Sequence, residues 1–426
     1  MRLEPSSLQT LIDEALAATP PGRAVWVALS GGLDSSLLLA LAAEASRRHP
    51  RPLRALHVHH GLQVAADDFE RHCRALCSRL GVPLHVERVN VDVSSGEGVE
   101  GAARRARYAA FGRRVGAGET LCLAHHRDDQ AETFLLAALR GAGPRGLAAM
   151  PTEREQAGAR LARPWLGVSR AALEAEAMRR GLTWVEDPSN AEVLHDRNFL
   201  RHRVMPLLEQ RWPDAGASLA CSAGLAGETD DLLDEFAAED LQRLGRDPGR
   251  LPVADLQALS LPRCRLLIRH CLRCLGLSSP PARRLASLLD QLDARHDAEV
   301  RIVWEETEAR IWRKTLYLMA PPVPLPPAWR VEWDGRAPLV TPLGEFCMAL
   351  EREDGAAASL VLTPRLGGER LPLPGRGRRD LKRLLQEWGL PPWERDRSWV
   401  VWHGECVVAV GSPQGWLALA EGWRAP

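Results

Sequence analysis

The 426-residue sequence lacks three features that would assign it to a special class. It holds no apolar run near the roughly 20 residues that a membrane-spanning helix needs, and its first residues, MRLEPSSLQTLIDEAL, contain no apolar signal-peptide core. It also lacks a charge excess, because 55 Lys and Arg balance 55 Asp and Glu. These absences predict a cytoplasmic protein without a membrane partner, and they confine any nucleic-acid contact to local basic patches.

Lysine is nearly absent, since Lys314 and Lys382 are the only two. The positive charge is therefore almost entirely arginine, whose planar guanidinium binds phosphate in a bidentate manner. A composition bias of the genome explains a chain-wide arginine excess without any function, and we favour that explanation. The arginine content alone therefore assigns no partner.

The cysteines are scattered and odd in number, nine in all, which predicts reduced thiols rather than a disulfide framework. Cys271 and Cys274 form a C-x-x-C pair, and Cys73 and Cys77 lie one helical turn apart. Neither pair is joined by the second spaced pair that a convincing zinc site requires. We therefore expect core residues or chance neighbours here.

The first third of the chain alternates apolar, strand-like runs with helical patterns. The expected strands are 24–29, 54–58, 84–91 and 120–124, and the expected helices are 35–45, 65–80, 99–115 and 128–139. This alternation predicts an α/β fold with a mostly parallel, doubly wound sheet that helices cover on both faces. Ligands of such folds bind beyond the carboxyl ends of the strands.

Further domains are expected after this α/β part, because 426 residues exceed one ordinary domain. The segment 217–292 has a helical pattern and shows no strand signal before 300–304. A proline-dense connector follows at 320–329, and the rest is strand-rich with one helix near 380–388. We therefore divide the chain into an α/β domain, a helical domain, and a linker with a small α+β C-terminal domain, at 1–215, 216–320 and 321–426.

The segment SGGLDSS, from Ser30 to Ser36, follows the first expected strand and opens the first expected helix. Its glycines let the backbone approach a ligand, while successive N–H groups and the helix N-terminus supply partial positive charge. A capped helix start after a tight turn would need no ligand, but the context favours phosphate binding. The lysine of the common nucleotide-triphosphate loop is absent, so another class of phosphate loop is indicated.

A second cluster combines two histidines with three acids: His125, His126, Asp128, Asp129 and Glu132. The acids open an expected helix at spacings of three and four, so they share a face. Complementarity to the helix N-terminus would explain some of this charge, but three acids beside two histidines exceed that need. Two roles stay open, oxygen ligands for Mg²⁺ or a site for ammonium groups, while a zinc cluster lacks supporting thiols.

The SGGLDS segment resembles the pyrophosphate loop of the N-type ATP pyrophosphatases, the PP-loop superfamily. Members cleave ATP between the α and β phosphates and adenylate an oxygen of their substrate. Further segments resemble one family within it, the tRNA(Ile)-lysidine synthases. These segments are HVHHGL (57–62), EGAARRARY (100–108), AHHRDDQAET (124–133), RGAGPRGL (140–147), EDPSN (186–190), RN and RH (197–198 and 201–202) and LLQEWGLPPWERDR (384–397).

The resemblance implies an ATP-dependent ligase that joins free L-lysine to C2 of the wobble cytidine in tRNA(Ile) with anticodon CAU. The implied intermediate is an adenylated cytidine, the product is lysidine, and AMP and pyrophosphate are released. ATP and Mg²⁺ are the implied cofactors and tRNA(Ile) the implied partner, while a homodimer is left open.

With this resemblance, site residues can be assigned by number in this sequence. ATP binding is assigned to Ser30, Gly31, Gly32, Leu33, Asp34, Ser35, His57 and His59. Catalysis is assigned to Asp34, Asp129, Glu132 and Arg104, and Mg²⁺ binding to Asp34 and Asp128. For Arg104 and its neighbours Arg105 and Arg107, a solvated basic face is an equal alternative to phosphate or carboxylate binding.

Two other functions compete with this hypothesis. A tRNA thiolase on the same fold would need a persulfide cysteine or an iron–sulfur cluster near the loop, and Cys73, Cys77 and Cys122 lie in that domain. A nucleotide-sensing tRNA-binding protein without catalysis would not need the intact loop and acid cluster.

A basic cluster near the end of the chain predicts a contact with tRNA. Five cationic side chains fall between Arg376 and Arg383, opposed only by Asp380. Arg379, Lys382 and Arg383 have spacings that share one face of the expected helix. A solvated face is the alternative to tRNA binding.

Overall fold

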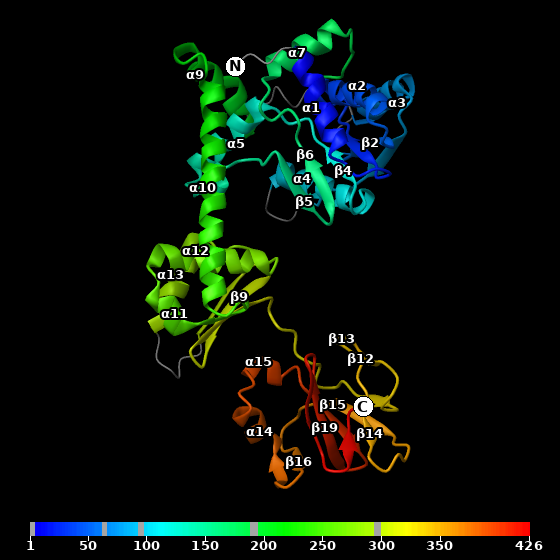
Figure 1. Ribbon diagram of the computed structural model, residues 1–426, viewed down its shortest axis with the longest axis vertical. Coiled ribbons are helices and arrows are strands. Elements are labelled where there is room, and N and C mark those ends of the chain that lie inside the picture. The colour runs from blue at the N-terminus through cyan, green and yellow to red at the C-terminus, as the bar shows by residue number, and fades with distance from the viewer. Residues whose placement is uncertain (1–4, 62–65, 93–97, 188–194, 294–299) are drawn as a thin grey trace. The chain divides into compact units, whose positions relative to one another are not determined.

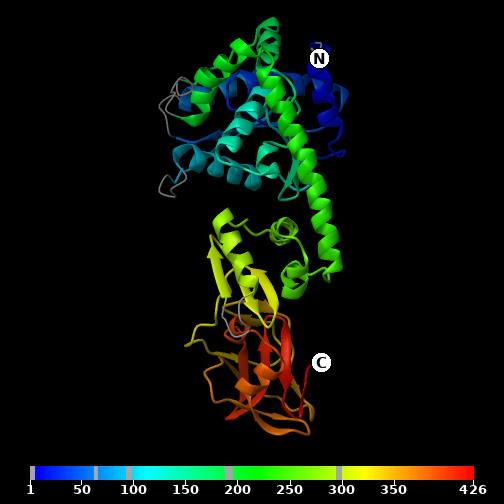
Figure 2. The same ribbon diagram turned by 90° about the vertical axis from the view of Figure 1, so that its left-hand side faces the viewer.

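The computed structural model describes residues 5–61, 66–92, 98–187, 195–293 and 300–426 (Figure 1). Contacts divide the chain into two compact units, residues 1–233 and 234–426, and each has its own hydrophobic core. Helix α10 (Ala215–Arg243) crosses the boundary between them in sequence and is continuous in both views (Figures 1 and 2).

The sheet of the first unit has the parallel architecture that the sequence predicts. Its described strands are β1 (Val25–Ala28), β2 (Leu53–His59), β3 (Leu84–Arg88), β4 (Thr120–Cys122), β5 (Glu153–Gln156) and β6 (Ala159–Ala162). They lie in the order β3-β2-β1-β4-β6-β5, and every neighbouring pair is parallel except the hairpin β5–β6. β1 is central, because Val25 pairs with Leu53 on one side and Thr120 on the other.

Helices cover both faces of this sheet. The described helices of the unit are α1 (Pro5–Ala17), α2 (Leu33–Arg48), α3 (Ala66–Leu80), α4 (Gly98–Arg114), α5 (Arg127–Leu139), α6 (Pro144–Leu147), α7 (Arg170–Arg179), α8 (Asp196–Phe199), the π-helical segment Leu200–Val204, α9 (Met205–Arg211) and α10. Successive strand side chains point to opposite faces. Val25 and Val27 accordingly share a core with α1, α2, α3 and α7, whereas Trp26 shares another with Phe111 of α4. The predicted doubly wound α/β fold is therefore confirmed.

Helix α2 is the most enclosed helix of this layer and carries the phosphate-loop motif at its start. Leu37, Leu38 and Leu39 are all fully buried, because α2 packs against α1, α3 and α7 as well as against the sheet. An apolar helix surrounded in this way holds its first turn in a fixed position.

Two strand features were not predicted from the sequence. The hairpin β5–β6 was missed, because EREQ has no apolar alternation. It is ordered through its partner strand β6, which pairs with β4, Thr120 opposite Arg160. Strand β7 (Arg250–Pro252) interrupts the segment predicted to be purely helical. It is only three residues long and forms by pairing with a distant strand, Leu251 opposite Leu316, which local patterning does not reveal.

The second unit begins with helices packed on a small antiparallel sheet. Its sheet has the order β7-β10-β9-β8. The elements are β7, α11 (Val253–Ala258), α12 (Leu261–Cys274), α13 (Ala282–Asp290), a 3-10 turn (Gln291–Asp293), β8 (Val300–Trp304), β9 (Thr307–Trp312) and β10 (Thr315–Met319). Leu267, Ile268 and Cys271 of α12 are fully buried in its core.

The strand-rich remainder is organised around the sheet β11-β15-β18-β19-β20. Its elements are β11 (Val331–Trp333), β12 (Leu339–Thr341), β13 (Gly344–Phe346), β14 (Glu351–Arg352), β15 (Leu360–Pro364), β16 (Arg370–Leu373), β17 (Gly377–Asp380), α14 (Leu381–Glu387), α15 (Pro392–Arg395), β18 (Trp399–His403), β19 (Cys406–Ser412), β20 (Gly415–Leu419) and β21 (Trp423–Arg424). Helix α14 starts one residue later than predicted, with Asp380 as its N-cap.

The basic cluster near α14 needs a correction for this reason. Arg379 lies on strand β17, where it pairs with Leu371, and does not share a helical face with Lys382 and Arg383. All three cationic side chains are nevertheless exposed. Across the described ranges, none of the helices combines the length and the apolar content needed to cross a bilayer.

Candidate active site

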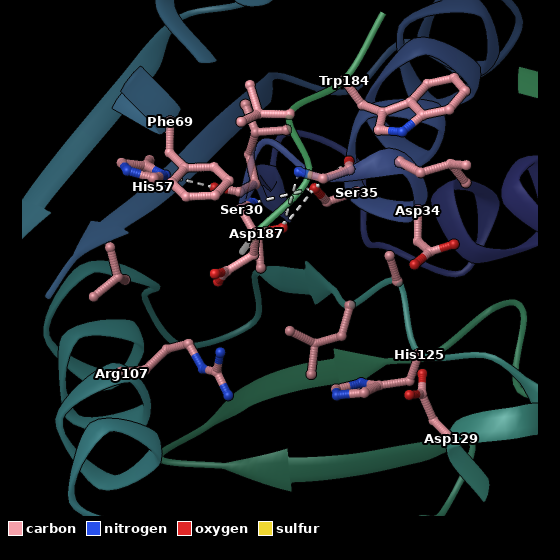
Figure 3. Close-up of a pocket in the computed structure, with 18 of the residues that line it drawn as sticks. Ser30, Asp34, Ser35, His57, Phe69, Arg107, His125, Asp129, Trp184 and Asp187 are labelled. Carbon is pink, nitrogen blue, oxygen red and sulfur yellow. Dashed lines mark hydrogen bonds between the residues drawn. The ribbon is translucent and has the colours of Figure 1, made fainter. Parts of the chain in front are cut away.

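A cavity of about 930 Å³ opens at the carboxyl ends of β1, β2 and β4 in the first unit. Leu29 and Ser30 follow β1 into it, His59 ends β2 at its wall, and Leu123 and Ala124 follow β4. Parallel strands end at one edge, so residues far apart in sequence meet there. Figure 3 shows side chains from the loop, from α4 and from the segment after β4 surrounding this space.

The loop after β1 is folded around the hydroxyl of Ser35. The backbone N–H groups of Ser30 and Gly31 donate to Ser35 Oγ at 3.2 and 3.3 Å, and that hydroxyl donates to the carbonyl of Gly32 at 3.1 Å. The hydroxyls of Ser30 and Ser35 also lie 2.9 Å apart (Figure 3). The loop is therefore held in shape by its own serines.

Glycine is required at position 31 for two reasons. Its φ is +94°, in the region that L side chains rarely adopt, and an added Cβ would lie 3.3 Å from Cys73 Sγ and 3.4 Å from Phe69 Cδ1. The Gly31 carbonyl also accepts the N–H of Val185 at 3.1 Å, which ties the segment around Trp184 to the loop. The loop's shape thus depends on α3 and on a distant segment as well as on its own sequence.

The first turn of α2 presents unshared N–H groups to the cavity. Its N-cap is Gly32, which provides no side-chain cap, and Gly32, Leu33, Asp34 and Ser35 all line the cavity. Because the first N–H groups of a helix have no partners within the helix, this terminus carries a partial positive charge. A phosphate group fits such a terminus, as the sequence predicts for this loop.

Asp34 stands at the same helix start and has an oxygen without a partner. Its Oδ1 is buried and accepts no hydrogen bond from any described residue, while Oδ2 lies 3.9 Å from His126 Nε2. Burial raises the pKa of the Asp34 carboxyl and outweighs the opposite effect of His126 and Arg170. An unpartnered carboxylate oxygen beside a phosphate cradle is the environment that suits a hard cation such as Mg²⁺.

His126 is the hub of the acid cluster. It caps α5 through a capping box, in which its Nδ1 accepts the N–H of Asp129 at 3.4 Å and the Asp129 carboxylate accepts the N–H of His126 at 3.0 Å. Its ring nitrogens also lie 3.5 Å from Asp128 and 3.4 Å from Asp129. Burial lowers the pKa of His126, but Asp128, Asp129 and Asp34 outweigh burial, so its pKa lies above the ordinary value.

Asp128 links His126 to the start of α7. Its Oδ2 accepts the backbone N–H of Arg170 at 2.8 Å, at the start of α7. Burial opposes ionisation, but the contacts with His126 and Arg170 outweigh it and lower the pKa of Asp128 to about 2. The carboxylate is therefore ionised throughout the neutral range, as a cation ligand must be.

Asp129 and Glu132 form a four-residue ion cluster with two arginines. Arg197 donates to Glu132 Oε2 at 2.8 Å and to Asp129 Oδ1 at 3.0 Å. Arg201 donates to both Glu132 oxygens at 2.7 and 3.0 Å and to Asp129 Oδ1 at 3.2 Å. Burial opposes ionisation of Asp129, but the charges of His126 and Arg197 outweigh it and lower the pKa of that carboxyl. The acids are thus placed by arginines, and their role toward an ammonium group stays a prediction.

The histidines at the end of β2 lie in the cavity wall. His57 is buried and its Nδ1 is 2.8 Å from the carbonyl of Leu29, while His59 Nε2 is 3.1 Å from Asp67. Burial lowers the pKa of His57 and holds that of His60 at about 4. The rings of His57 and His60 are therefore neutral near pH 7, and direct contact of His57 and His59 with ATP stays a prediction.

The arginine helix α4 brings a different residue to the cavity from the one assigned. Arg104 lies over the ring of Tyr108, 5.3 Å from its centroid, and is not among the described cavity-lining residues. Arg107 does line the cavity, and Figure 3 shows it reaching from α4 toward it. A catalytic role for Arg104 stays a prediction, and Arg107 is the better-placed guanidinium.

The cysteines near the loop are unreactive in character. Burial raises the pKa of Cys73 to about 12, that of Cys77 to about 11 and that of Cys122 to about 12. Thiolate is the nucleophilic form, so these three thiols pack as core residues at neutral pH. That chemistry does not suit sulfur transfer.

Several site residues have no role in the sequence-based assignment. Arg197 and Arg201 enter the sequence analysis only as parts of segments that resemble the family. Their spacing of four residues, one helical turn, was the available signal that both can contact the same carboxylate. Arg201 lies in a π-helical turn, Leu200–Val204, which no sequence pattern announces. The segment EDPSN is described only at Glu186 and Asp187, which line the cavity; 188–190 lie outside the described residues.

A parallel sheet with a lysine-free phosphate loop at its carboxyl edge defines an enzyme domain of the PP-loop class, and a PP-loop domain model matches residues 5–208. Models described as TilS substrate binding domain and TilS substrate C-terminal domain match residues 251–317 and 360–418. Proteins named tRNA(Ile)-lysidine synthase from Xanthomonas axonopodis pv. citri and Pseudomonas putida are 46% and 45% identical, covering 96% and 94% of this chain and 96% and 95% of theirs. The chain belongs to the tRNA(Ile)-lysidine synthase family.

A solved structure gives a weaker likeness. The U34-tRNA thiolase NcsA from Methanococcus maripaludis, with its [4Fe-4S] cluster, aligns at 17% identity and a TM-score of 0.43, covering 51% of this chain and 76% of that one. A likeness at this level distinguishes no activity.

Proposed function

We propose that the chain joins lysine to C2 of the wobble cytidine of tRNA(Ile) with anticodon CAU, consuming ATP and releasing AMP and pyrophosphate. One observation carries the proposal: the uncapped start of α2 and the Asp34–His126 group line the same cavity as two members of the ion cluster, Asp129 and Arg201. A nucleotide-binding terminus and a charged amino-acid site in one cavity are what a two-step ligation requires.

ATP binding is proposed for the residues of the loop and the helix start. The first-turn N–H groups of α2 would hold the phosphates that leave as pyrophosphate, with Ser30 and Ser35 keeping the loop in shape. Leu33 lines the cavity at this position, and the rings of His57 and His59 form the neighbouring wall. Arg107 supplies a guanidinium to the cavity, where a phosphate or carboxylate would meet it.

Mg²⁺ is proposed to bind between Asp34, Asp128 and the phosphates. Within the described ranges, no group of three or more His, Cys, Asp or Glu side chains is arranged to hold a metal by itself. Mg²⁺ usually takes one or two carboxylates and completes its shell with water and substrate phosphates, so this donor set fits it. The ion would neutralise charge on the leaving pyrophosphate.

In the first step, the cytidine O2 attacks the α phosphate, and pyrophosphate leaves. The enzyme's part is to align the two groups and to stabilise negative charge at the helix terminus. In the second step, the ε-amine of lysine attacks C2, and AMP leaves with the oxygen. Free lysine has a side-chain pKa of about 10.4, so a group of the enzyme must take its proton.

The lysine site is proposed at Asp129 and Glu132. The arginine pair compensates both carboxylates, so an incoming ammonium group must share them with Arg197 and Arg201. His125 is a poor proton acceptor, because burial lowers its pKa to about 3. The pKa of Asp129 is lowered as well, so His126 and Asp34, whose pKa values are raised, are the better acceptors of the lysine proton.

The remaining assignments are also proposals. The helical part 216–320 and the C-terminal part 321–426 would hold the tRNA body, and a homodimer stays a prediction. A tRNA thiolase is the weaker alternative, since Cys73, Cys77 and Cys122 are buried with raised pKa values.

The decisive experiment measures incorporation of labelled lysine into a tRNA(Ile) transcript with anticodon CAU. Incorporation should require ATP and release one AMP for each lysine, and a transcript with uridine at the wobble position should stay unlabelled. ATP-dependent sulfur incorporation without lysine incorporation would instead establish the thiolase. Tight tRNA binding without AMP formation would establish a non-catalytic protein.

A further inference from the structure

A cysteine, a histidine and an aspartate meet in the second unit, outside the cavity of the first. Cys274 Sγ lies 3.4 Å from His270 Nε2, and His270 Nδ1 lies 2.7 Å from Asp234 Oδ1. His270 and Cys274 are one turn apart on α12, and Asp234 belongs to α10 (Figure 1). This is the order of groups found in thiol nucleophiles activated by an oriented base.

The burial of the three groups suits their roles. Cys274 is exposed, whereas the His270 side chain is only 11% exposed. Burial lowers the pKa of His270, so the ring is neutral at pH 7 and free to accept a proton. Asp234 also pairs with Arg273, and its contact with Nδ1 selects the tautomer whose Nε2 lone pair faces the thiol.

A second thiol lies one turn earlier on the same helix. Cys271 precedes Cys274 by three residues on α12 and is fully buried. Burial, with smaller contributions from Cys274 and Asp247, raises the pKa of Cys271 to about 12, so this thiol is protonated at rest and must lose its proton as it attacks an oxidised sulfur. An exposed thiol with a buried thiol one turn away is the arrangement of an attacking and a resolving cysteine.

We propose that Cys274 is a peroxide-reactive thiol, activated by His270 and Asp234, whose oxidised form closes a disulfide with Cys271. Cys274 sulfur attacks a hydroperoxide, the O–O bond breaks, and sulfur loses two electrons while gaining one oxygen as sulfenic acid. His270 takes the thiol proton and passes it to the departing oxygen, which leaves as water or alcohol. The Cys271 thiol then attacks the sulfenic sulfur, forms the S–S bond and releases water.

The position of Cys274 places its thiol beside the base. Cys274 is the last residue of α12, one turn after His270, whose Nε2 lies 3.4 Å from the sulfur. The ring can therefore take the thiol proton during the attack. Within the described ranges, three further cysteines are exposed but have no histidine in hydrogen-bond contact, and they serve as internal controls: Cys221, Cys347 and Cys406.

The first test compares alkylation rates within one molecule. Full-length protein is treated with limiting iodoacetamide at pH 7, and each cysteine is quantified by mass spectrometry. Cys274 should react about tenfold faster than Cys221 or Cys406, and His270→Gln should remove that advantage without changing the controls. A Cys274 rate equal to the controls overturns the proposal. If His270→Gln unfolds, the conservative Asp234→Asn variant must slow Cys274 selectively instead.

The second test detects the disulfide. Stoichiometric hydrogen peroxide is followed by blocking and trypsin, which cuts after Arg273 and separates the two cysteines. The product should be peptide 270–273 linked to peptide 274–283, and dithiothreitol should release both. In Cys271→Ala, the sulfenic acid on Cys274 should persist and react with dimedone. Absence of the linked peptides in wild type, with dimedone labelling of Cys274 there, overturns the role of Cys271.

Discussion

Replacing Glu132 by glutamine tests the ion cluster of α5 most directly. Glu132 is 1% exposed and accepts three hydrogen bonds of 2.7–3.0 Å from Arg197 and Arg201. Glutamine keeps one acceptor oxygen and loses the charge, so about two charge-assisted bonds are lost. At roughly 1.5–3 kcal/mol each, the free energy of unfolding should fall by about 3–6 kcal/mol, close to the roughly 3–5 kcal/mol cost of breaking a buried pair. The midpoint of thermal unfolding should fall by on the order of 10 °C.

The same change should weaken lysine binding more than ATP binding. Loss of one ammonium contact should raise the KM for lysine by about tenfold or more, while the KM for ATP changes little, because the phosphate loop keeps its own bonds. Lysine incorporation into tRNA gives both constants. Circular dichroism gives the unfolding midpoint of the same preparation.

A matched surface pair provides the control for this prediction. Glu153 pairs with Arg160 but is 51% exposed, so Glu153→Gln should cost at most about 1 kcal/mol and leave both KM values unchanged. In a double-mutant cycle, Arg201→Gln should cost less in the Glu132→Gln background than in wild type. If Glu132→Gln behaves like Glu153→Gln in stability and in lysine dependence, the cluster is neither a buried ion network nor the lysine site.

Three further predictions concern other parts of the chain. Asp34→Asn should abolish AMP formation yet raise the midpoint of thermal unfolding near pH 7. Because the folded-state pKa of Asp34 is raised, this gain in stability should be full at pH values above that pKa and vanish below the pKa of the unfolded chain. An active variant, or a less stable one, would refute the assignment. Serine or alanine at the buried first-unit thiols should leave lysine incorporation intact, and a folded but inactive variant would revive the thiolase: Cys73, Cys77 and Cys122. Changing Arg378, Arg379 and Arg383 to Glu should weaken tRNA binding and reduce its dependence on salt concentration, while ATP binding stays unchanged. Filter binding from low to high salt measures both properties. A normal affinity and a normal salt dependence would make the cluster a solvated surface.

Local patterning was enough to predict the framework of the first unit. The apolar runs that become β1, β2 and β4 and the amphipathic α3 carry their structure in their own periodicity, so their bounds differ from prediction by a few residues. Strand β7 and the β5–β6 hairpin could not be found in this way, because segments of only three or four residues become strands only when a partner strand supplies the hydrogen bonds. Arg379 was misplaced for a related reason, since Asp380 caps α14 and leaves the preceding residues to pair with β16.

The sequence motifs of the site could be recognised, but the contacts between its side chains could not be predicted. The loop motif indicates an anion cradle because glycine, serine and a helix start act over short sequence distances. The partners of Asp129 and Glu132 lie more than sixty residues later, and charge type alone does not reveal that arginines occupy both carboxylates. Arg104 and Arg107 belong to the same arginine-rich segment, and the sequence does not reveal which of them faces the cavity. The orientation of α4 decides that Arg107 lines it.

The hydroxyl of Ser35 has a consequence for the energetics of nucleotide capture. Because the amides of Ser30 and Gly31 donate to that oxygen, the loop is held in one shape by its own hydrogen bonds without a phosphate. A preorganised receptor loses little backbone entropy on binding, so more of the contact energy appears as affinity. The enclosed helix α2 extends this rigidity into the core, whereas the cytidine and the lysine must reach the cavity from solution. Variation in turnover among tRNA substrates should therefore reflect how the RNA is positioned, with the nucleotide end of the reaction kept constant.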